Sequence, residues 1–364
     1  MIDFVKRPAP STDHMSDYDR NSSVQDKMIR FRSSKIAALA AGLPRAADGT
    51  LVIQDYGCGP GHSALDAVRP AIDALREAAP DAPIVVRHSD QPGNDWNALL
   101  HLVFGENGYH HLGNIRTETA VGSFYDPLAA PGSVSLATSF AASHWLSRVE
   151  RPYSPGTVSF DNLEGEALTV VRDLAHADWA RFLARRAAEL MEGGVLVVGT
   201  LGSMPDAAAP NGFRAAGARF IRAFEAVAET MVADGLLSRD RLDHFVLPYW
   251  FLTIEEATAP LRNGSNLARA FEVVEATLSL VEAAHNEIYG ATFDDPVDYG
   301  RRTAGYVRGF TESTMRLHLF ADDAASAAEM DARIDEFFRR YAAHIPGASG
   351  PAELFNSLLI LRRR

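Results

Sequence analysis

The chain has 364 residues, a formal net charge of −12 and one cysteine, Cys58. The acidic balance argues against a nucleic-acid partner, and a lone cysteine excludes an intramolecular disulfide framework or a cysteine-based zinc cluster. The sequence contains no run of about eighteen uninterrupted apolar residues to span a membrane, and its polar N-terminus has no apolar signal core. We therefore expect a cytoplasmic protein with a sizeable core, since 47% of the residues are hydrophobic.

The first half of the chain alternates predicted helices and strands. Helices are expected over 23–41, over the residues that follow the 55–61 turn, and over 173–191; strands are expected over 51–55, 83–88, 135–139 and 195–199. Gly193-Gly194 is expected to end the last of these helices. The alternation predicts an α/β fold built on a mostly parallel sheet.

The second half of the chain is predominantly helical. Helical patterns cover 213–236, 253–262 and 301–320, and returning strands are expected over 271–281 and 357–361. So much helix predicts a cap over the ligand edge of the sheet. The expected organisation is an N-terminal arm at 1–22, a core at 23–203 and 265–364 with cap helices from 301–345, and a main cap insertion at 204–264.

A glycine-rich turn follows the first predicted strand. The segment 55–61 reads Asp-Tyr-Gly-Cys-Gly-Pro-Gly and runs from a strand into a helix. Gly57, Gly59 and Gly61 permit positive φ angles and close approach of the backbone to a ligand. A nucleotide at the carboxyl ends of the strands is then expected, although an ordinary tight turn with a surface Asp55 is the structural alternative.

The acidic residues around this turn favour S-adenosylmethionine over NAD. A dinucleotide site usually places its ribose-binding acid about 20 residues after the turn, whereas Asp90 lies 35 positions after Asp55. Pro60 offers no N–H to a pyrophosphate. S-Adenosylmethionine has no phosphate but carries a sulfonium, an ammonium and two ribose hydroxyls, which acids suit. Asp90 is the candidate for the hydroxyls, and Asn94 or Asp95 is a candidate helix N-cap.

Seven segments, in order, resemble the SABATH family of carboxyl and N-methyltransferases. The sequence at 90–97, DQPGNDWN, is close to the family's NDLPGNDFN and is the most specific match. The others are Tyr18 with Asn21-Ser22 and Gln25, Asp55 to Cys58, Gly122 to Tyr125, His144 to Ser147, Gly193-Gly194, and Phe245 to Glu256. Departures include Asp17 and Gln91, which replace a serine and a leucine, and Ala141, which stands where an aromatic residue is common.

The resemblance implies a Rossmann-like class I methyltransferase core with a helical cap, a homodimer, and S-adenosylmethionine as the cofactor without metal. It also suggests secondary metabolism, and the many Ala and Arg residues and the short loops suggest a bacterial member. By motif match the cofactor residues are Tyr18, Ser22, Asp55, Gly57, Gly59, Gly61, Ser63, Asp90, Gln91, Ser123 and Phe124. The catalytic residues, which hold the substrate carboxylate, are Gln25 and Trp145; the remaining substrate residues are His144, Phe220, Ile221, Trp250 and Phe310.

The function that follows is methyl ester formation on a small, mostly apolar carboxylic acid. A carboxylate is ionised at neutral pH and needs no general base. The neutral donors of Gln25 and Trp145 would aim it at the methyl group. Trp145 as a core aromatic, Gln25 as a solvated helix residue and His144 as a buried polar contact are the structural alternatives. His110-His111 lacks other ligands at metal-binding spacing and is interpreted as a surface loop.

Three other functions remain open at this stage. N-methylation of a small heteroaromatic ring is the first, because the family includes such enzymes. A non-catalytic S-adenosylmethionine-binding protein is the second, although such a module would not need both the cofactor and the carboxylate segments. A dehydrogenase is the third.

Overall fold

The computed structural model describes residues 33–209, 211–262, 264–280, 295–321, 326–347 and 353–364. Its main sheet has seven strands in the order β3-β2-β1-β4-β5-β9-β8. These strands are β1 (Leu51–Tyr56), β2 (Ile84–Asp90), β3 (Ile115–Val121), β4 (Val134–Phe140), β5 (Leu190–Leu201), β8 (Phe271–Leu280) and β9 (Phe355–Arg363). A two-stranded sheet pairs β6 (Ser203–Pro205) with β7 (Phe213–Ala215).

Strands β1 to β5 are parallel, and β9 is antiparallel to both of its neighbours, β5 and β8. Every residue of β4 is buried, as expected for a strand that helices cover on both faces. The mostly parallel α/β sheet predicted from the alternating pattern is therefore confirmed.

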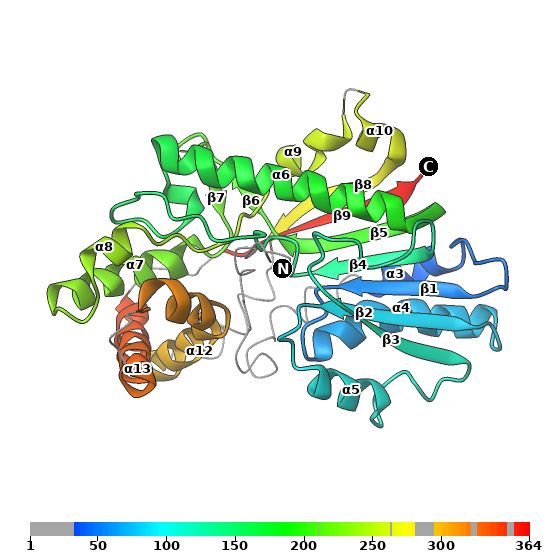
Figure 1. The fold of residues 1–364 in the computed structure, drawn as a ribbon, viewed down its shortest axis with the longest axis horizontal. Helices are drawn as coiled ribbons and strands as arrows, with labels where there is room; N and C mark the ends of the chain where they lie inside the picture. Colours follow the sequence, from blue (N-terminus) through cyan, green and yellow to red (C-terminus); the bar gives the residue numbers. More distant parts are fainter. Residues whose placement is uncertain (1–32, 210, 263, 281–294, 322–325, 348–352) are drawn as a thin grey trace, which may run out of the picture.

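Helices cover both faces of the sheet (Figure 1). One face packs against α3 (Ser33–Ala40), α4 (His62–Ala78) and α5 (Trp96–Phe104), and the other against the long helix α6 (Gly165–Glu189). Helix α4 buries Ala64, Val68, Ile72 and Leu75 at helical spacing. Asp95 caps α5 by accepting a hydrogen bond from the Ala98 N–H at 3.0 Å, as predicted.

The cap lies beyond the carboxyl ends of the parallel strands, at the left of Figure 1. It consists of α7 (Ala218–Ala233), α8 (Arg239–Asp243), α12 (Pro296–Thr314) with the π-helical turn η4 (Met315–Leu319), and α13 (Ala327–His344). The rings of Phe224 on α7 and Phe337 on α13 lie 4.6 Å apart. The Tyr341 hydroxyl donates to the Phe220 carbonyl at 3.0 Å. Apolar packing and this hydrogen bond join the two halves of the cap.

Short elements fill the connections. The 3-10 turns are η1 (Phe160–Asn162), η2 (Ala259–Leu261) and η5 (Ile345–Gly347). Helices α9 (Ile254–Thr258) and α10 (Asn266–Ala270) lie beside β8 and α6 rather than with the cap helices (Figure 1). The domain boundaries given above stay predictions. No helix in the described ranges is long and apolar enough to cross a membrane.

Three details differ from the sequence-based expectation. The predicted end of a helix at Gly193-Gly194 is wrong: α6 ends at Glu189, and the glycines lie inside β5, where the pairing with β4 shifts between Val134 and Leu136. Strand β3 was not predicted. The segment 213–236 begins with strand β7, and its helix starts at Ala218. Of the helix expected over 23–41, residues 23–32 lie outside the described residues.

A mostly buried carboxylate on the cap helix α7, with 12% of its side chain exposed, faces the 158–161 segment. Glu225 accepts a hydrogen bond from the Val158 N–H at 3.0 Å, and Arg222 lies 3.7 Å away. Burial raises the pKa of Glu225 from 4.5 to about 7. The folded protein therefore binds this proton more tightly than the unfolded chain does. The stability that this carboxyl contributes is present below pH 4.5 and is lost as the pH rises to about 7.

Glu225→Gln should remove this pH dependence. At pH 8 we expect the variant to be more stable than the wild type by on the order of 1–3 kcal/mol, and the difference should shrink toward pH 4.5. Urea denaturation at both pH values measures it. Glu229→Gln on the same helix is the control, because Arg239 lowers the pKa of Glu229. It should not stabilise the protein at pH 8. An equal gain for Glu225→Gln at both pH values would contradict the explanation.

Candidate active site

The 55–61 turn packs tightly against the ends of two neighbouring strands. The N–H groups of Gly57 and Cys58 donate to the Ser89 carbonyl at 2.8 and 3.1 Å. Gly57 has a φ of +76°, and a Cβ built on it would lie 2.3 Å from the Cβ of Ala142. Both the backbone angle and the space therefore require glycine here.

Gly59 is held from both sides by the segment that follows β2. Its N–H donates to an Asp90 carboxylate oxygen at 2.7 Å, and its carbonyl accepts from the Asn94 side-chain amide at 3.0 Å. Among the residues that the structure describes, none has an atom within 4 Å of a Cβ built on Gly59. This role of Asn94 was not predicted.

Asp90 fits the ribose hydroxyls of S-adenosylmethionine in its chemistry. One carboxylate oxygen takes the Gly59 N–H, and the other takes the Gln91 N–H at 2.7 Å. Carboxylate oxygens are the kind of acceptor that two ribose hydroxyls require. The donors and acceptors present at this turn therefore suit the cofactor in their chemistry.

Asp55 lies underneath the turn, and only 2% of its surface is exposed. One of its oxygens accepts from the Thr138 hydroxyl at 2.9 Å, and the other is 3.5 Å from Nδ1 of the buried His88. On its other side, Nε2 of His88 lies 2.9 Å from the Tyr109 hydroxyl oxygen. The Asp55 carboxylate is thus enclosed by protein and supports the turn from below. Its direct contact with a cofactor stays a prediction.

The segment after β3 completes this edge of the sheet. The Gly122 N–H donates to the Asp90 carbonyl at 2.8 Å. Ser123 accepts from the Tyr125 N–H at 3.2 Å. The Phe124 ring lies 3.8 Å from the position of a Cβ on Gly57. The segment that carries Ser123 and Phe124 therefore lies at the glycine turn. Gly61 and the buried Ser63, which the motif match also assigned to the cofactor, lie where α4 begins.

A second feature, an apolar cavity, lies between the ends of β4 and β5 and the cap. Most of its walls are aromatic or aliphatic. The lining residues are Ala141, His144, Trp145, Leu201, Ala216, Gly217, Phe220, Ile221, Tyr249, Phe251, Tyr306, Phe310 and Leu354. The structure thus brings together five of the residues predicted to bind substrate: His144, Trp145, Phe220, Ile221 and Phe310.

Trp250 does not line the cavity and is a correction to the predicted pocket. Its side chain is 2% exposed and packs against Phe160 with ring centroids 4.7 Å apart. In this extended segment neighbouring side chains point to opposite sides. Tyr249 and Phe251, stacked 4.7 Å apart, line the cavity instead. Residues 247–252 are apolar or aromatic throughout, so the sequence does not show which of their side chains face the cavity.

His144 is an uncharged member of the cavity wall. Its Nδ1 lies 2.6 Å from the Thr200 hydroxyl, and its ring is 5.3 Å from that of Trp145. Burial lowers the pKa of His144 to about 3, so the ring is neutral near pH 7. Nearby, Ala141 has a φ of +50°, a strained left-handed conformation of the kind that concentrates at functional sites.

Three predicted residues cannot be placed. Tyr18, Ser22 and Gln25 lie outside the described residues. Their assignment to the cofactor and to the substrate carboxylate stays a prediction.

Comparison with known proteins places the chain among plant and fungal relatives. Gibberellic acid methyltransferase 2 of Arabidopsis thaliana is 23% identical over 84% of this chain and 82% of its own length. Indole-3-acetate O-methyltransferase 1 of Oryza sativa subsp. japonica is 26% identical over 66% of each chain. The suggestion of a bacterial enzyme stays a prediction.

The fold agrees with a solved relative. The structure of a loganic acid methyltransferase with SAH matches with a TM-score of 0.74 at 18% identity, covering 97% of this chain and 98% of that one. This likeness shows the class I methyltransferase fold. A family model described as SAM dependent carboxyl methyltransferase matches residues 11–349. Because that match spans nearly the whole chain, the protein belongs to the family of S-adenosylmethionine-dependent carboxyl methyltransferases.

Proposed function

We propose that this methyltransferase esterifies a small, mostly apolar carboxylic acid whose body lies in the cavity and whose carboxylate is oriented by Trp145 together with Gln25. The observation that carries the proposal is the chemistry of the wall. The described residues that line the cavity carry no charge, because His144 is neutral. They offer an acid apolar surface and a few neutral donors. The relatives named for gibberellic acid, indole-3-acetate and loganic acid support a carboxylate acceptor.

When bound, S-adenosylmethionine would supply a methyl group from its cationic sulfonium to a carboxylate oxygen, and its sulfur would keep the electron pair of the broken carbon–sulfur bond, with no proton moved. The protein residues have two tasks. Asp90, Ser123 and Phe124 would hold the cofactor at the glycine turn. Trp145 and Gln25 would orient the carboxylate toward the methyl group.

An apolar and uncharged lining of described residues suits this reaction. The acid and the sulfonium carry opposite charges that are both lost on transfer, and water stabilises such charges before the reaction. An arginine would bind the carboxylate more strongly in the ground state, which does not accelerate transfer. Neutral donors orient the acid without that strong binding. The homodimer implied by the resemblance and the cytoplasmic location expected from the composition are further proposals.

The first prediction concerns the cofactor. Asp90→Asn keeps the shape of the side chain but removes the charge that would hold the ribose hydroxyls. The dissociation constant of S-adenosylmethionine, measured by calorimetry, should rise at least about tenfold, since a hydrogen bond to a charged group contributes about 1.5–3 kcal/mol. Asp73→Asn, an exposed carboxylate on α4 that pairs with Arg69, is the control and should bind normally. Unchanged affinity in a folded Asp90→Asn protein would remove Asp90 from the site.

The second prediction tests carboxylate orientation. Trp145→Phe keeps most of the ring and deletes the indole N–H, so turnover of the acid should fall roughly a hundredfold with S-adenosylmethionine affinity little changed. Gln25→Leu should behave alike. Trp250→Phe is the matched control, because Trp250 lies outside the cavity, and it should keep turnover. The product should be cleaved by mild alkali. An alkali-resistant product would favour ring N-methylation instead.

The third prediction concerns pH. The acid is ionised above about pH 5, and the pKa of His144 is lowered to about 3 by burial, so neither group changes its charge between pH 6 and 9. The kcat/KM for the acid should be level over this range. A decline centred near pH 6.5 that His144→Asn abolishes would show that His144 does titrate during the reaction.

A further inference from the structure

Two oppositely charged side chains are completely enclosed near the end of α6. Arg186 and Glu189 have 0% and 2% of their side-chain surface exposed, and Nη2 of Arg186 lies 2.8 Å from Oε2 of Glu189. The proposed transfer does not use them directly. Burial of two charges carries a desolvation cost that their attraction does not always offset, so such a pair is weak evidence of a stabilising role. The destination of its other hydrogen bonds is more informative.

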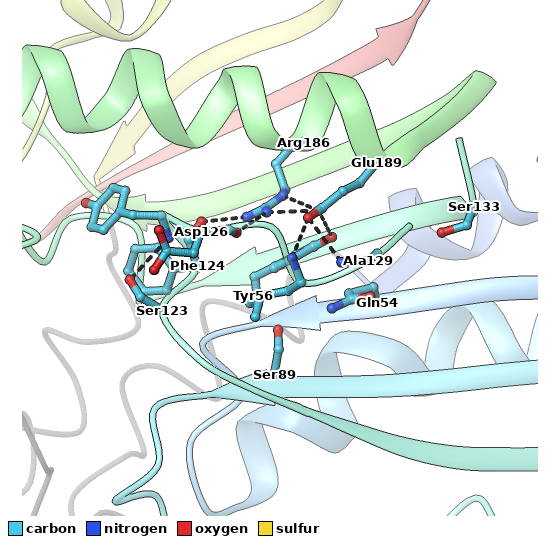
Figure 2. Close-up of polar contacts among 12 residues, drawn as sticks. Gln54, Tyr56, Ser89, Ser123, Phe124, Asp126, Ala129, Ser133, Arg186 and Glu189 are labelled. Atoms are coloured by element: carbon cyan, nitrogen blue, oxygen red, sulfur yellow. Dashed lines mark hydrogen bonds and ion pairs between the residues drawn. The ribbon is translucent and has the colours of Figure 1, made fainter. Parts of the chain in front are cut away.

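Most of these hydrogen bonds go to the segment after β3 (Figure 2). Arg186 donates to the carbonyls of Phe124 at 2.8 Å and Asp126 at 3.3 Å. Glu189 accepts from the N–H groups of Leu128 at 2.7 Å and Ala129 at 3.2 Å. Residues 124–129 form neither helix nor strand. In a helix or strand, the backbone groups of this segment would bond to other backbone groups. Here the ion pair supplies charge-assisted hydrogen bonds to them instead.

The same pair holds the residue that precedes the glycine turn. The Tyr56 hydroxyl donates to Glu189 at 2.6 Å, and the guanidinium carbon of Arg186 lies 3.8 Å from the centre of the Tyr56 ring. Burial raises the pKa of Tyr56, which keeps its hydroxyl protonated as a donor. Tyr56 is the last residue of β1 and is followed directly by Gly57. Figure 2 shows the charged groups between Tyr56 and the 124–129 segment.

We propose that Arg186 and Glu189 are positioning residues for cofactor binding, which fix Ser123 and Phe124 against the glycine turn. Neither residue touches the cofactor. They act through the Phe124 carbonyl and through Tyr56, from within the protein. The inference rests on the assignment of Ser123 and Phe124 to the cofactor in the proposed function.

Two near-isosteric variants test the inference. Glu189→Gln keeps the size and one acceptor but removes the charge. Arg186→Lys keeps the charge but cannot bond both carbonyls with a planar fork. For each we measure the dissociation constant of S-adenosylmethionine, the KM of the acid at saturating cofactor, and the melting temperature. The expected result is a rise of at least about tenfold in the dissociation constant, equivalent to about 1.4 kcal/mol, with the KM of the acid changed less than about twofold.

Arg181→Gln is the matched control. Arg181 reaches from the same helix to the same segment, 2.7 Å from an Asp126 carboxylate oxygen, but the two side chains are 44% and 47% exposed. Exposed pairs contribute little, so cofactor affinity should stay at the wild-type value. If either buried variant fails to fold, Tyr56→Phe takes its place, because it deletes only the hydroxyl bonded to Glu189. Tyr56→Phe and the remaining variant should then show the same rise in the dissociation constant of S-adenosylmethionine.

The inference is overturned if the folded variants bind S-adenosylmethionine within about twofold of the wild type. It is also overturned if the dissociation constant of the cofactor and the KM of the acid rise in the same proportion, as a general loss of structure would produce. Cofactor binding is measured without any acid. Failure to find an esterified acid would therefore count against the proposed function, whereas the dissociation constants and melting temperatures of the folded variants would still decide this inference.

Discussion

Close packing at Gly57 is the constraint on which the rest of the site depends. The residue has no side chain, has a positive φ and lies against Ala142, so the turn after β1 and the chain leaving β4 meet with no space between them. Phe124 approaches the same point from the segment after β3. The chain that leaves Ala142 leads directly to His144 and Trp145. The missing side chain of Gly57 thus sets the distance between the glycine turn and the wall of the apolar cavity.

The two halves of the site are built from different physical interactions. The side proposed for the cofactor is polar and is held by hydrogen bonds, with Asp90 and Asn94 on either side of Gly59. The side proposed for the substrate is apolar and is lined by the stacked rings of Tyr249 and Phe251 and by rings of the cap helices. A carboxylate needs both, because its charged end must meet a cation while its apolar body leaves water.

The sequence predicted the elements whose structure is determined by residues that are neighbours along the chain. Strands β1 and β5 contain short apolar runs at 51–53 and 195–198, and the segments 55–61 and 90–97 carry their meaning in adjacent residues. Prediction failed for β3, an edge strand whose alternating exposure and polar residues resemble a loop. Arg186 and Glu189 look like an ordinary solvated helix pair, since burial depends on the 124–129 segment that covers them. Trp250 was assigned to the wrong side of the 249–251 segment, because side chains alternate along this extended segment although it lies in a loop.

The uncharged cavity also bears on the balance between bound substrate and bound product. Transfer converts an anion into a neutral ester. Had an arginine faced the acid, the reaction would leave that cation buried without its partner, a penalty of about 3–5 kcal/mol against the bound ester. Neutral donors such as the Trp145 indole leave no orphaned charge behind. The equilibrium between bound acid and bound ester is therefore free of that penalty. No charge is left unpaired in the wall when the ester departs.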